Sequence, residues 1–565
     1  MKHLPVPPLR QSLDRFLEAV QPLSNAEQQR HAEEVVAQFS AADGHACQAE
    51  LFRFANHENE AGRSWLSRAW LSAYLTSRDP LPLVSSVGFR MRWDGGNTGI
   101  ARAADVLHRV GSVHLAYLRG EIDNEVSARG DAMDMSQWQV LAGGLRHPLP
   151  GEDVILEGRP EAASREIGVL WQGRLVMMPI SDGAGRPVPR SALEEALHRL
   201  PELELSDDDF FTHPSYLGSA RASILLDVLL ADPDNAAVYE RLVHAVFIVN
   251  LTDIPASDEE HQERTTFHPG QAWAYKPFTY QVSLVDDFVG VHAEHSSVDG
   301  VTLRSMIALM QKAEPVDGDA EPLSLEHLTW RMPEDLRKQL LDDIASYRQQ
   351  AAAHRVRILH IPVAVPPDLP FRVSHDALQQ FVLLYAQLVA YGRARSTYEA
   401  ADMREYQSGR TECLRPVTSD ALALVQALID GCAAPDHLYL ALAAHRDQII
   451  TCKSGQGFNR HLFGLRLMAE HLGLEAPLFN DASYHRLTTD FLSTSSVGDA
   501  AQIMRFTFAP TSAGGIGVNY SLTDGVYEYC LIHNTDQVEH IDDFVRALEA
   551  GVSALGQLLA RVGEG

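Results

Sequence analysis

Apolar residues recur at helical spacing in the first part of the chain. Residues 4–23 begin with prolines and continue with apolar positions three and four apart, which predicts a helix. Ser24 and Glu27 fit a capping box, so a second helix is expected to run from there to about Phe39. Residues 65–75 predict another helix with one apolar face. This part of the chain is therefore expected to be helical.

Strand patterns dominate later regions. Alternating apolar and polar residues predict strands at 280–285, 289–295, 355–365, 490–497, 502–510 and 515–522. Helices are predicted from Ser191, from Pro333, and over 375–408 and 417–430. The acidic stretch 314–322 is rich in proline and glycine and is the best candidate for a linker. Mixed helices and strands in two halves indicate an α/β or α+β fold.

Composition and charge narrow the class of protein. The 565 residues are 45% hydrophobic and carry a net charge of −28, which argues against a general nucleic-acid surface. The sequence has no apolar run of about 18 residues, the length that a membrane span needs, and its start does not resemble a signal peptide. The five cysteines form no CxxC pair, so neither a disulfide framework nor a metal site is indicated. We expect a cytoplasmic monomer without a membrane span or a nucleic-acid partner.

Candidate chemistry begins with HAEHSSVDG at residues 292–300. His295 could act as a general base, because imidazole titrates near neutral pH. Asp299 could fix the local backbone by pairing with an arginine, and Gly300 would allow a turn too tight for a side chain. A histidine at a strand end is more often a hydrogen-bonded structural residue, and the motif alone leaves that alternative open.

Three other stretches carry polar side chains suited to a substrate. In LSTSSV at 492–497, a hydroxyl could donate to a developing oxyanion, or the run could be the polar face of an edge strand. Tyr398 and Thr411, with Gly409 as a helix cap between them, could hold a small polar substrate or be ordinary helix-end residues. Arg460 offers a fixed positive charge for a carboxylate, although a surface salt bridge is the default interpretation.

These segments together resemble the choline/carnitine O-acyltransferase family. LPVPPLRQSLDRFLEAVQPL is similar to the family's opening signature, SWLSRAWLSAYL to its tryptophan-rich helix, and AEHSSVDG to its catalytic-histidine segment. STYEAADMREYQSGRTECLRP, GFNRHLFGL and LSTSSV resemble its substrate-site segments. The segments occur in the family's order over nearly the whole chain, so the combination is highly specific.

The resemblance implies an α/β fold of two chloramphenicol-acetyltransferase-like domains around a central active-site tunnel. Residues 62–325 would form an N-domain that carries the catalytic histidine. Residues 1–61 plus 326–565 would form a C-domain that carries most substrate-binding residues. Coenzyme A would enter from one side and carnitine from the other, with His295 midway. No bound cofactor is implied, because acyl-CoA is a co-substrate.

The resemblance also implies roles for individual residues. His295 would deprotonate the carnitine hydroxyl, supported by Asp299, and Ser495 would stabilise the oxyanion without a covalent acyl-enzyme. The residues implied to bind carnitine are Tyr398, Thr411, Arg460, Ser493, Phe508 and Tyr74. The residues implied to contact coenzyme A are Arg372, Arg446, Asp376 and Ser496.

Acceptor and chain length can be argued from residue chemistry. Carnitine has a carboxylate and choline does not, so Thr411 and Arg460 favour carnitine, because a choline site would leave the arginine desolvated and unpaired. Phe506 aligns with a bulky residue of the family's short-chain members, where long-chain members have glycine. We therefore predict reversible transfer of a short acyl group between coenzyme A and the hydroxyl of L-carnitine.

The chain departs from the family pattern on the donor side. Arg372 is the only permanent cation where the family has several lysines for the CoA 3′-phosphate, and Ser496 replaces a glutamine. Two rivals stay open. One is a same-fold acyltransferase with another acceptor, such as choline or another amino alcohol, or with a carrier-bound donor. The other is an inactive ligand-binding homologue, against which the intact His295, Asp299 and Ser495 weigh.

Overall fold

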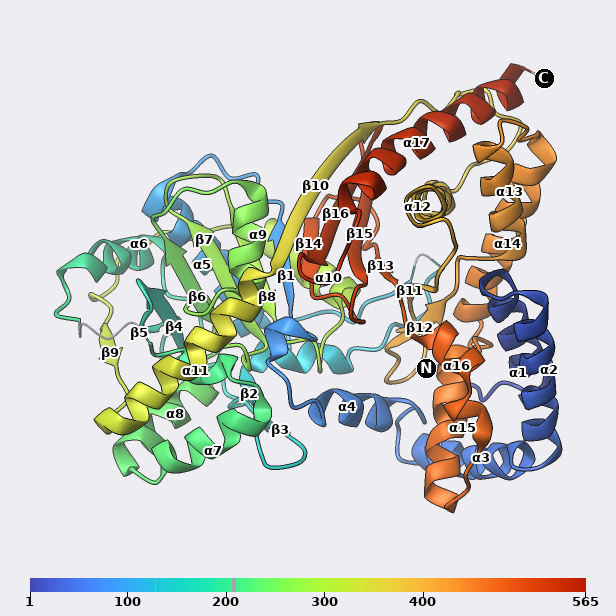
Figure 1. Cartoon of the computed structure of the whole chain (residues 1–565). Coiled ribbons are helices and arrows are strands. Elements are labelled where there is room, and N and C mark those ends of the chain that lie inside the picture. Colours follow the sequence, from blue (N-terminus) through green and yellow to red (C-terminus); the bar gives the residue numbers. More distant parts are fainter. Residues whose placement is uncertain (128, 206–209, 565) are drawn as a thin grey trace.

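The computed structural model describes residues 1–127, 129–205 and 210–564. Two α/β halves, each built around one large sheet, lie side by side (Figure 1). The helices are α1 Leu9–Val20, α2 Ala26–Ala41, α3 Gly44–Glu60, α4 Ser67–Leu75, α5 Gly99–Leu118, α6 Arg190–His198, α7 Ser219–Leu230, α8 Pro233–His244, α9 Asp258–Phe267, α10 Gly300–Lys312, α11 Glu334–Ala352, α12 His375–Tyr391, α13 Ser419–Ile429, α14 Pro435–Lys453, α15 Asn459–Leu472, α16 Ala482–Thr488 and α17 Ile541–Glu564. The predicted α/β class is confirmed.

The first half contains an eight-stranded mixed sheet in the order β14-β1-β8-β7-β6-β4-β5-β9. Its strands are β1 Val87–Met91, β4 Glu166–Trp171, β5 Arg174–Pro179, β6 Ile248–Thr252, β7 Phe278–Ser283, β8 Val289–Ala293, β9 Glu326–Leu328 and β14 Ile503–Phe508. β6 is parallel to β4 and β7, and the other neighbours are antiparallel. Apolar side chains of α5, α6 and α10 form one core with the sheet, and those of α7, α8 and α11 form another. A separate hairpin joins β2 Gly144–His147 and β3 Val154–Glu157.

The second half contains a six-stranded sheet in the order β10-β16-β15-β13-β11-β12. Its strands are β10 His354–Pro362, β11 Thr397–Asp402, β12 Thr411–Leu414, β13 Leu492–Ser495, β15 Ile516–Thr523 and β16 Val526–Asn534. β13 is parallel to both β11 and β15. Helices α12, α13, α14 and α17 supply the apolar side chains that cover it. The run LSTSSV therefore lies on an inner strand, and the edge-strand interpretation is wrong.

One strand crosses from the second half of the sequence into the first sheet. β14 pairs antiparallel with β1, with Phe506 opposite Phe89 and Thr507 opposite Gly88. A Cβ atom at Gly88 would lie 2.1 Å from Oγ1 of Thr266, so only glycine lets α9 pack this closely on β1. β15 follows β14 directly in the sequence but belongs to the second sheet. Residues 503–523 therefore tie the two halves together.

The first three helices pack against α15 and α16, far from the first sheet (Figure 1). Leu13, Phe16 and Val20 are buried there, as their spacing predicts. The predicted capping box is one residue too early. Asn25 accepts from the backbone of Gln28, whose side chain accepts from the backbone N–H of Asn25, since Asn25 has the extended conformation of an N-cap.

The predicted helix over 375–408 is wrong beyond Tyr391. α12 ends there because Gly392 adopts a left-handed conformation with φ of 69° and caps it. The chain continues as β11, so Tyr398 lies on a strand rather than on a helix. Gly409 is no helix cap; a Cβ atom there would lie 2.0 Å from the carbonyl oxygen of Met403, which makes glycine necessary for a tight turn.

Most other sequence expectations match the described elements. The six predicted strand regions correspond to β7, β8, β10, β13, β14 and β15. Residues 314–322 have no regular secondary structure and connect α10 to β9. Among the helices in the described parts of the chain, none combines the length and apolar character that crossing a bilayer would require.

Candidate active site

A cavity of about 430 Å³ lies where the two halves meet. Its walls come from the loop after β8, the start of α10, strands β11, β13 and β14, and helices α4 and α15. The predicted site residues that line it are His295, Asp299, Ser495, Tyr398, Thr411, Arg460, Ser493, Phe508, Tyr74, Phe506 and Ser496. Residues more than 400 positions apart in the sequence thus share one chamber.

His295 lies in the short loop between β8 and α10, with its side chain 29% exposed. Its Nδ1 is 2.6 Å from the carbonyl oxygen of Val298. A carbonyl can only accept, so Nδ1 carries the proton and Nε2 keeps its lone pair. This tautomer gives His295 a free basic nitrogen, which is the form a general base requires.

Asp299 holds this loop through a buried ion pair with Arg410, which precedes β12. The guanidinium donates to both carboxylate oxygens, at 2.8 and 3.0 Å, and also to the backbone carbonyls of Ser296 and His295. Gln137 donates to the same carboxylate at 2.9 Å and accepts from the Asp299 backbone at 2.8 Å. Burial acts to raise the pKa of Asp299, but Arg410 outweighs it and holds that pKa below its ordinary value.

Gly300 has a different role from the predicted tight turn. It is the first residue of α10, and it is not among the glycines with positive φ in the described residues. A Cβ atom there would lie 3.3 Å from Cγ1 of Val497 and 3.5 Å from the ring of Phe89. Glycine at this position therefore allows close packing of the start of α10 against the residues after β13.

β13 presents alternate hydroxyl groups to the cavity. Ser493 and Ser495 line the chamber, and the Ser493 hydroxyl hydrogen-bonds that of Thr511. The Thr494 hydroxyl is buried and donates to the carbonyl of Tyr398 at 2.7 Å, which ties β13 to β11. Asn519 donates to the carbonyl of Ser495 at 3.2 Å. The strand thereby places the Ser495 hydroxyl in the same chamber as His295.

Arg460 provides a buried positive charge in the cavity. Its guanidinium lies 3.8 Å above the ring of Trp70 and donates to the Tyr398 hydroxyl at 3.2 Å and the Thr411 hydroxyl at 3.4 Å. Only 9% of the residue is exposed, so the surface salt-bridge alternative is wrong. Within the described ranges, no ion pair joins this guanidinium to a carboxylate. Burial raises the pKa of Tyr398, so its hydroxyl stays protonated and available to donate.

Aromatic side chains close the other part of the chamber. Phe506 is 4% exposed, and its ring centroid lies 5.2 Å from that of Phe89 and 6.1 Å from that of Phe508. The ring of Tyr74 lies 5.8 Å from that of His295, and burial raises its pKa. A bulky phenylalanine thus fills space next to β13.

The sequence matches the family model described as Choline/Carnitine o-acyltransferase over residues 4–550. The chain belongs to this family. It is therefore an O-acyltransferase, as the residue pattern predicted. It is 27% identical to human carnitine O-acetyltransferase, over 96% of this chain and 91% of the relative. It is 24% identical to mouse mitochondrial carnitine O-palmitoyltransferase 2, over 93% and 87%.

Two solved structures show weaker likeness. The epimerization domain from the third module of tyrocidine synthetase B has a TM-score of 0.38 at 10% identity, covering 88% of this chain and 96% of that one. TRI3 trichothecene 15-O-acetyltransferase from Fusarium sporotrichioides has a TM-score of 0.38 at 8% identity, covering 86% and 93%. TM-scores of this size support no argument about this acyltransferase.

The residues predicted to grip coenzyme A are only partly brought together in this O-acyltransferase. Ser496 lines the cavity, whereas Arg372, Arg446 and Asp376 lie outside its lining. Arg372 and Arg446 are exposed, and Asp376 is in the first turn of α12. The Asp376 side chain is 36% exposed and accepts from the Tyr520 hydroxyl at 2.7 Å.

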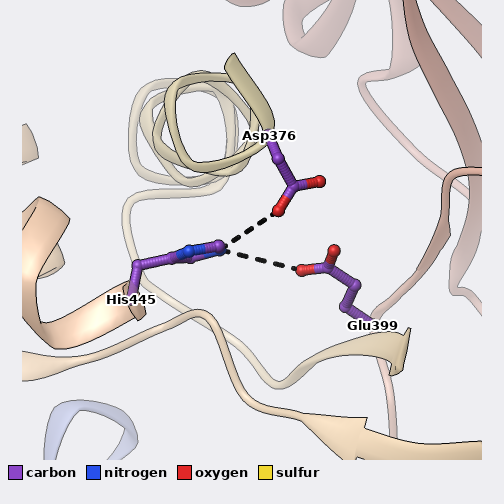
Figure 2. Close-up of side chains that lie close together, drawn as sticks. All are labelled: Asp376, Glu399 and His445. Carbon is purple, nitrogen blue, oxygen red and sulfur yellow. Dashed lines mark ion pairs between the residues drawn. The ribbon is translucent and has the colours of Figure 1, made fainter. Parts of the chain in front are cut away.

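Asp376 also belongs to a polar cluster that sequence reasoning missed. Figure 2 shows the His445 ring facing both Asp376 and Glu399, with Nε2 3.7 and 3.9 Å from their carboxyl oxygens. These side chains are the one group among the described residues whose donor atoms could hold a metal ion. Burial, and then the charge of Asp376, raise the pKa of Glu399 well above its ordinary value, while burial lowers that of His445.

Arg410, Gln137 and Trp70 contact predicted site residues but were not themselves predicted. The H-x-x-x-D spacing suggested an arginine partner for Asp299, but it could not say which arginine. Arg410 lies 111 positions away in sequence. Its position directly before Thr411, itself expected to contact substrate, was the one available signal.

Proposed function

We propose that this O-acyltransferase moves a short acyl group reversibly between coenzyme A and the hydroxyl of L-carnitine, with His295 as general base. The observation that carries the proposal is the buried guanidinium of Arg460, which shares a chamber with the free Nε2 of His295. An acceptor with a carboxylate and a hydroxyl would satisfy both groups at once. Choline has no carboxylate to pair with this guanidinium.

The acceptor would be held at both ends. Its carboxylate would accept from Arg460, Thr411 and Tyr398, which already form one hydrogen-bonded group. Its trimethylammonium would lie near Phe508, whose ring attracts a cation. Ser493 and Tyr74 would complete this side of the chamber.

The reaction would be a direct transfer. His295 Nε2 takes the proton from the acceptor hydroxyl as its oxygen attacks the thioester carbonyl carbon. The Ser495 hydroxyl donates to the oxyanion of the tetrahedral intermediate. The C–S bond then breaks, and the proton on His295 passes to the departing thiolate. The pair of Asp299 and Arg410 keeps the histidine loop in place throughout.

A carrier-bound acyl donor is the second candidate. Arg372 and Arg446 are exposed and lie outside the chamber lining. Their positions give little support for a dedicated binding site for the CoA 3′-phosphate. A carrier-bound phosphopantetheine thioester lacks that phosphate. No resident cofactor is proposed in either case, since the acyl thioester is consumed as a co-substrate.

The test is thiol release from acetyl-CoA with and without L-carnitine, using purified protein. We expect release that depends on carnitine and falls roughly 100- to 10,000-fold in His295→Ala, the range for loss of a general base. A folded protein that releases no thiol from acetyl-, octanoyl- or palmitoyl-CoA would sink the proposal for free CoA. Choline and carrier-bound thioesters would then be tried under the same conditions.

Phe506 supports the short-chain part of the proposal. Phe506→Ala should open space beside Phe89 and Phe508 and raise the rate with octanoyl-CoA relative to acetyl-CoA. The ratio of kcat/KM for the two donors is the readout, because it is insensitive to the amount of folded enzyme. An unchanged ratio would contradict the assignment of Phe506 to the acyl pocket.

Location and assembly remain predictions. We propose a cytoplasmic monomer, although the name of the mouse palmitoyltransferase relative includes the word mitochondrial.

A further inference from the structure

A second cleft, of about 650 Å³, lies next to the active-site chamber: Thr489 and Phe491 line the cleft, and Thr488 and Asp490 line the chamber. It is lined by the turn before α2, the segment between α12 and β11, the end of α16, and the loop after β14. None of the predicted substrate residues lines it. The proposed acyl transfer therefore gives this cleft no role.

The charge of this cleft is opposite to that of the whole chain. Arg393, Arg395 and Arg486 line it, and the described lining includes no aspartate or glutamate. The chain as a whole carries a net charge of −28. Hydrogen-bonding side chains complete the lining: Ser24, Asn25, Gln28, Ser396, Thr489, Ser512 and Gln537. Such a concentration of uncompensated positive charge attracts anions.

Arg395 is held in a fixed orientation. Its guanidinium lies 3.2 Å from the ring centroid of Phe491 and 4.5 Å from that of Tyr391. Its Nε is buried and has no hydrogen-bond partner in the described structure. Burial and the neighbouring charge of Arg393 lower the pKa of Arg395. Because this Nε is buried, a ligand can reach the guanidinium only through its terminal Nη atoms, which stacking leaves free for in-plane hydrogen bonds to carboxylate or phosphate oxygens.

The other two arginines also lack acidic partners. Arg486 donates to the Ser24 hydroxyl at 3.0 Å, a neutral acceptor. Arg393 is exposed. Over the described ranges, no ion pair joins Arg393, Arg395 or Arg486 to a carboxylate. Asp490, an acidic residue in the lining of the active-site chamber, is already paired with Arg415.

A thin polar wall separates the cleft from the active-site chamber. Ser396 and Ser512 line the cleft. The Ser512 hydroxyl donates to the carbonyl of Asp490 at 2.5 Å, and the Ser396 hydroxyl accepts from Arg415 at 3.0 Å. Asp490 and Arg415 line the chamber on the other side. The two cavities are therefore separate, yet they share one hydrogen-bonded partition.

We propose that this cleft is a second ligand site, which binds a small molecule carrying a multiply charged oxyanion group, either a phosphate or a cluster of carboxylates. The stacked Arg395 supplies a preorganised fork, and Arg486 and Arg393 supply further charge. The site is independent of the acyl-transfer proposal, because none of its residues has a part in that reaction.

The test is calorimetric titration of the full-length protein with inorganic pyrophosphate and, separately, with citrate. The two probes distinguish a phosphate from a carboxylate ligand. The variants are Arg395→Ala, Arg486→Ala and the charge reversal Arg393→Glu, which is at an exposed position and should not disturb folding. Arg466→Ala is the matched control, because Arg466 also lies over a phenylalanine, 5.5 Å from the ring of Phe463, but outside the cleft.

We expect one saturable site for at least one probe, with binding weakened tenfold or more by Arg393→Glu and Arg395→Ala. Arg466→Ala should leave it unchanged. No saturable binding at millimolar concentrations would overturn the proposal. So would equal binding by wild type and Arg393→Glu. Displacement by saturating CoA without any effect of the cleft variants would place the anion in the donor site, and it too would refute the second site.

Discussion

Arg460 is the residue whose chemistry separates the two possible acceptors. Arg460→Ala removes charged hydrogen bonds worth about 1.5–3 kcal/mol, so KM for carnitine should rise roughly 10- to 150-fold. Choline makes no use of this charge, and its turnover should not fall. Steady-state kinetics with both acceptors provide the measurement, with Arg466→Ala as the control. Equal losses for carnitine and choline would mean that Arg460 acts only through the structure.

Glu399 makes stability depend on pH in an unusual direction. Its folded-state pKa is raised above the unfolded value of about 4.3, so the folded protein holds a proton that the unfolded chain releases. Its contribution is full below that unfolded pKa and is lost as the pH rises through the folded pKa. Glu399→Gln removes this loss. The Tm of the variant minus that of wild type should therefore increase between pH 4.5 and 8.

The control for this experiment is Glu33→Gln, an exposed glutamate on α2. Its Tm difference from wild type should not depend on pH. A flat difference for Glu399→Gln as well would contradict the raised pKa. Any pH-independent effect of the glutamine amide on Tm cancels, because only the change of the Tm difference with pH is compared.

Single residues of the site were predictable where a short motif carried them. His295 and Asp299 were singled out by their four-residue spacing, whereas Ser493 and Ser495 were chosen from a run of hydroxyls only through the family resemblance. All four line the chamber. Arg410 was not predictable, because its pairing with Asp299 depends on how β12 and α10 meet in three dimensions. The exposed position of Arg372 was not predictable for the same reason. The sequence of a loop does not determine which cavity its arginine faces.

At the level of elements, Arg410 links the start of β12 to the loop between β8 and α10. Arg410→Met leaves Asp299 buried without its partner, which should cost about 3–5 kcal/mol of unfolding free energy. The kcat should also fall, because the carbonyls of Ser296 and His295 lose their donor. Urea unfolding and acyl-transfer rates are the two measurements.

The double variant Asp299→Asn/Arg410→Met distinguishes the cost of burying an unpaired charge from the loss of the contacts that position the His295 loop. It leaves no unpaired charge, so it should recover part of the stability that the single variant loses. Recovery of stability without recovery of kcat would identify the pair as positioning residues for His295. If the double variant is as unstable as Arg410→Met, the buried charge is not the cause.

Element prediction failed where two signals conflicted. The helix that begins as α12 was predicted to run to residue 408, yet Gly392 caps it in a left-handed conformation directly after Tyr391. For α2, Ser24 and Asn25 are both good N-cap residues with an extended backbone. The Asn25 side chain accepts from the first turn of the helix, whereas the Ser24 hydroxyl accepts from Arg486. Strand β14 was predicted in sequence, but nothing local could place it in the sheet of the other half.

The charge of the whole molecule bears on the identity of the donor. A net charge of −28 repels coenzyme A, which is itself an anion, and neither Arg372 nor Arg446 lines the active-site chamber to offset this. Salt screens such repulsion, since the Debye length falls from about 30 Å at 0.01 M to about 8 Å at 0.15 M. Carnitine is a zwitterion with no net charge, so its binding should respond much less.

Raising the salt concentration from about 10 to 150 mM should therefore lower KM for acetyl-CoA, by roughly twofold or more, while KM for carnitine stays nearly constant. Steady-state kinetics at several salt concentrations measure both constants in the same enzyme, and carnitine serves as the internal control. A KM for acetyl-CoA that rises with salt would contradict this expectation, because it would mean that local cations hold the CoA phosphates. Arg372→Ala would then be the variant to examine, since loss of the salt dependence in it would identify Arg372 as one of those cations.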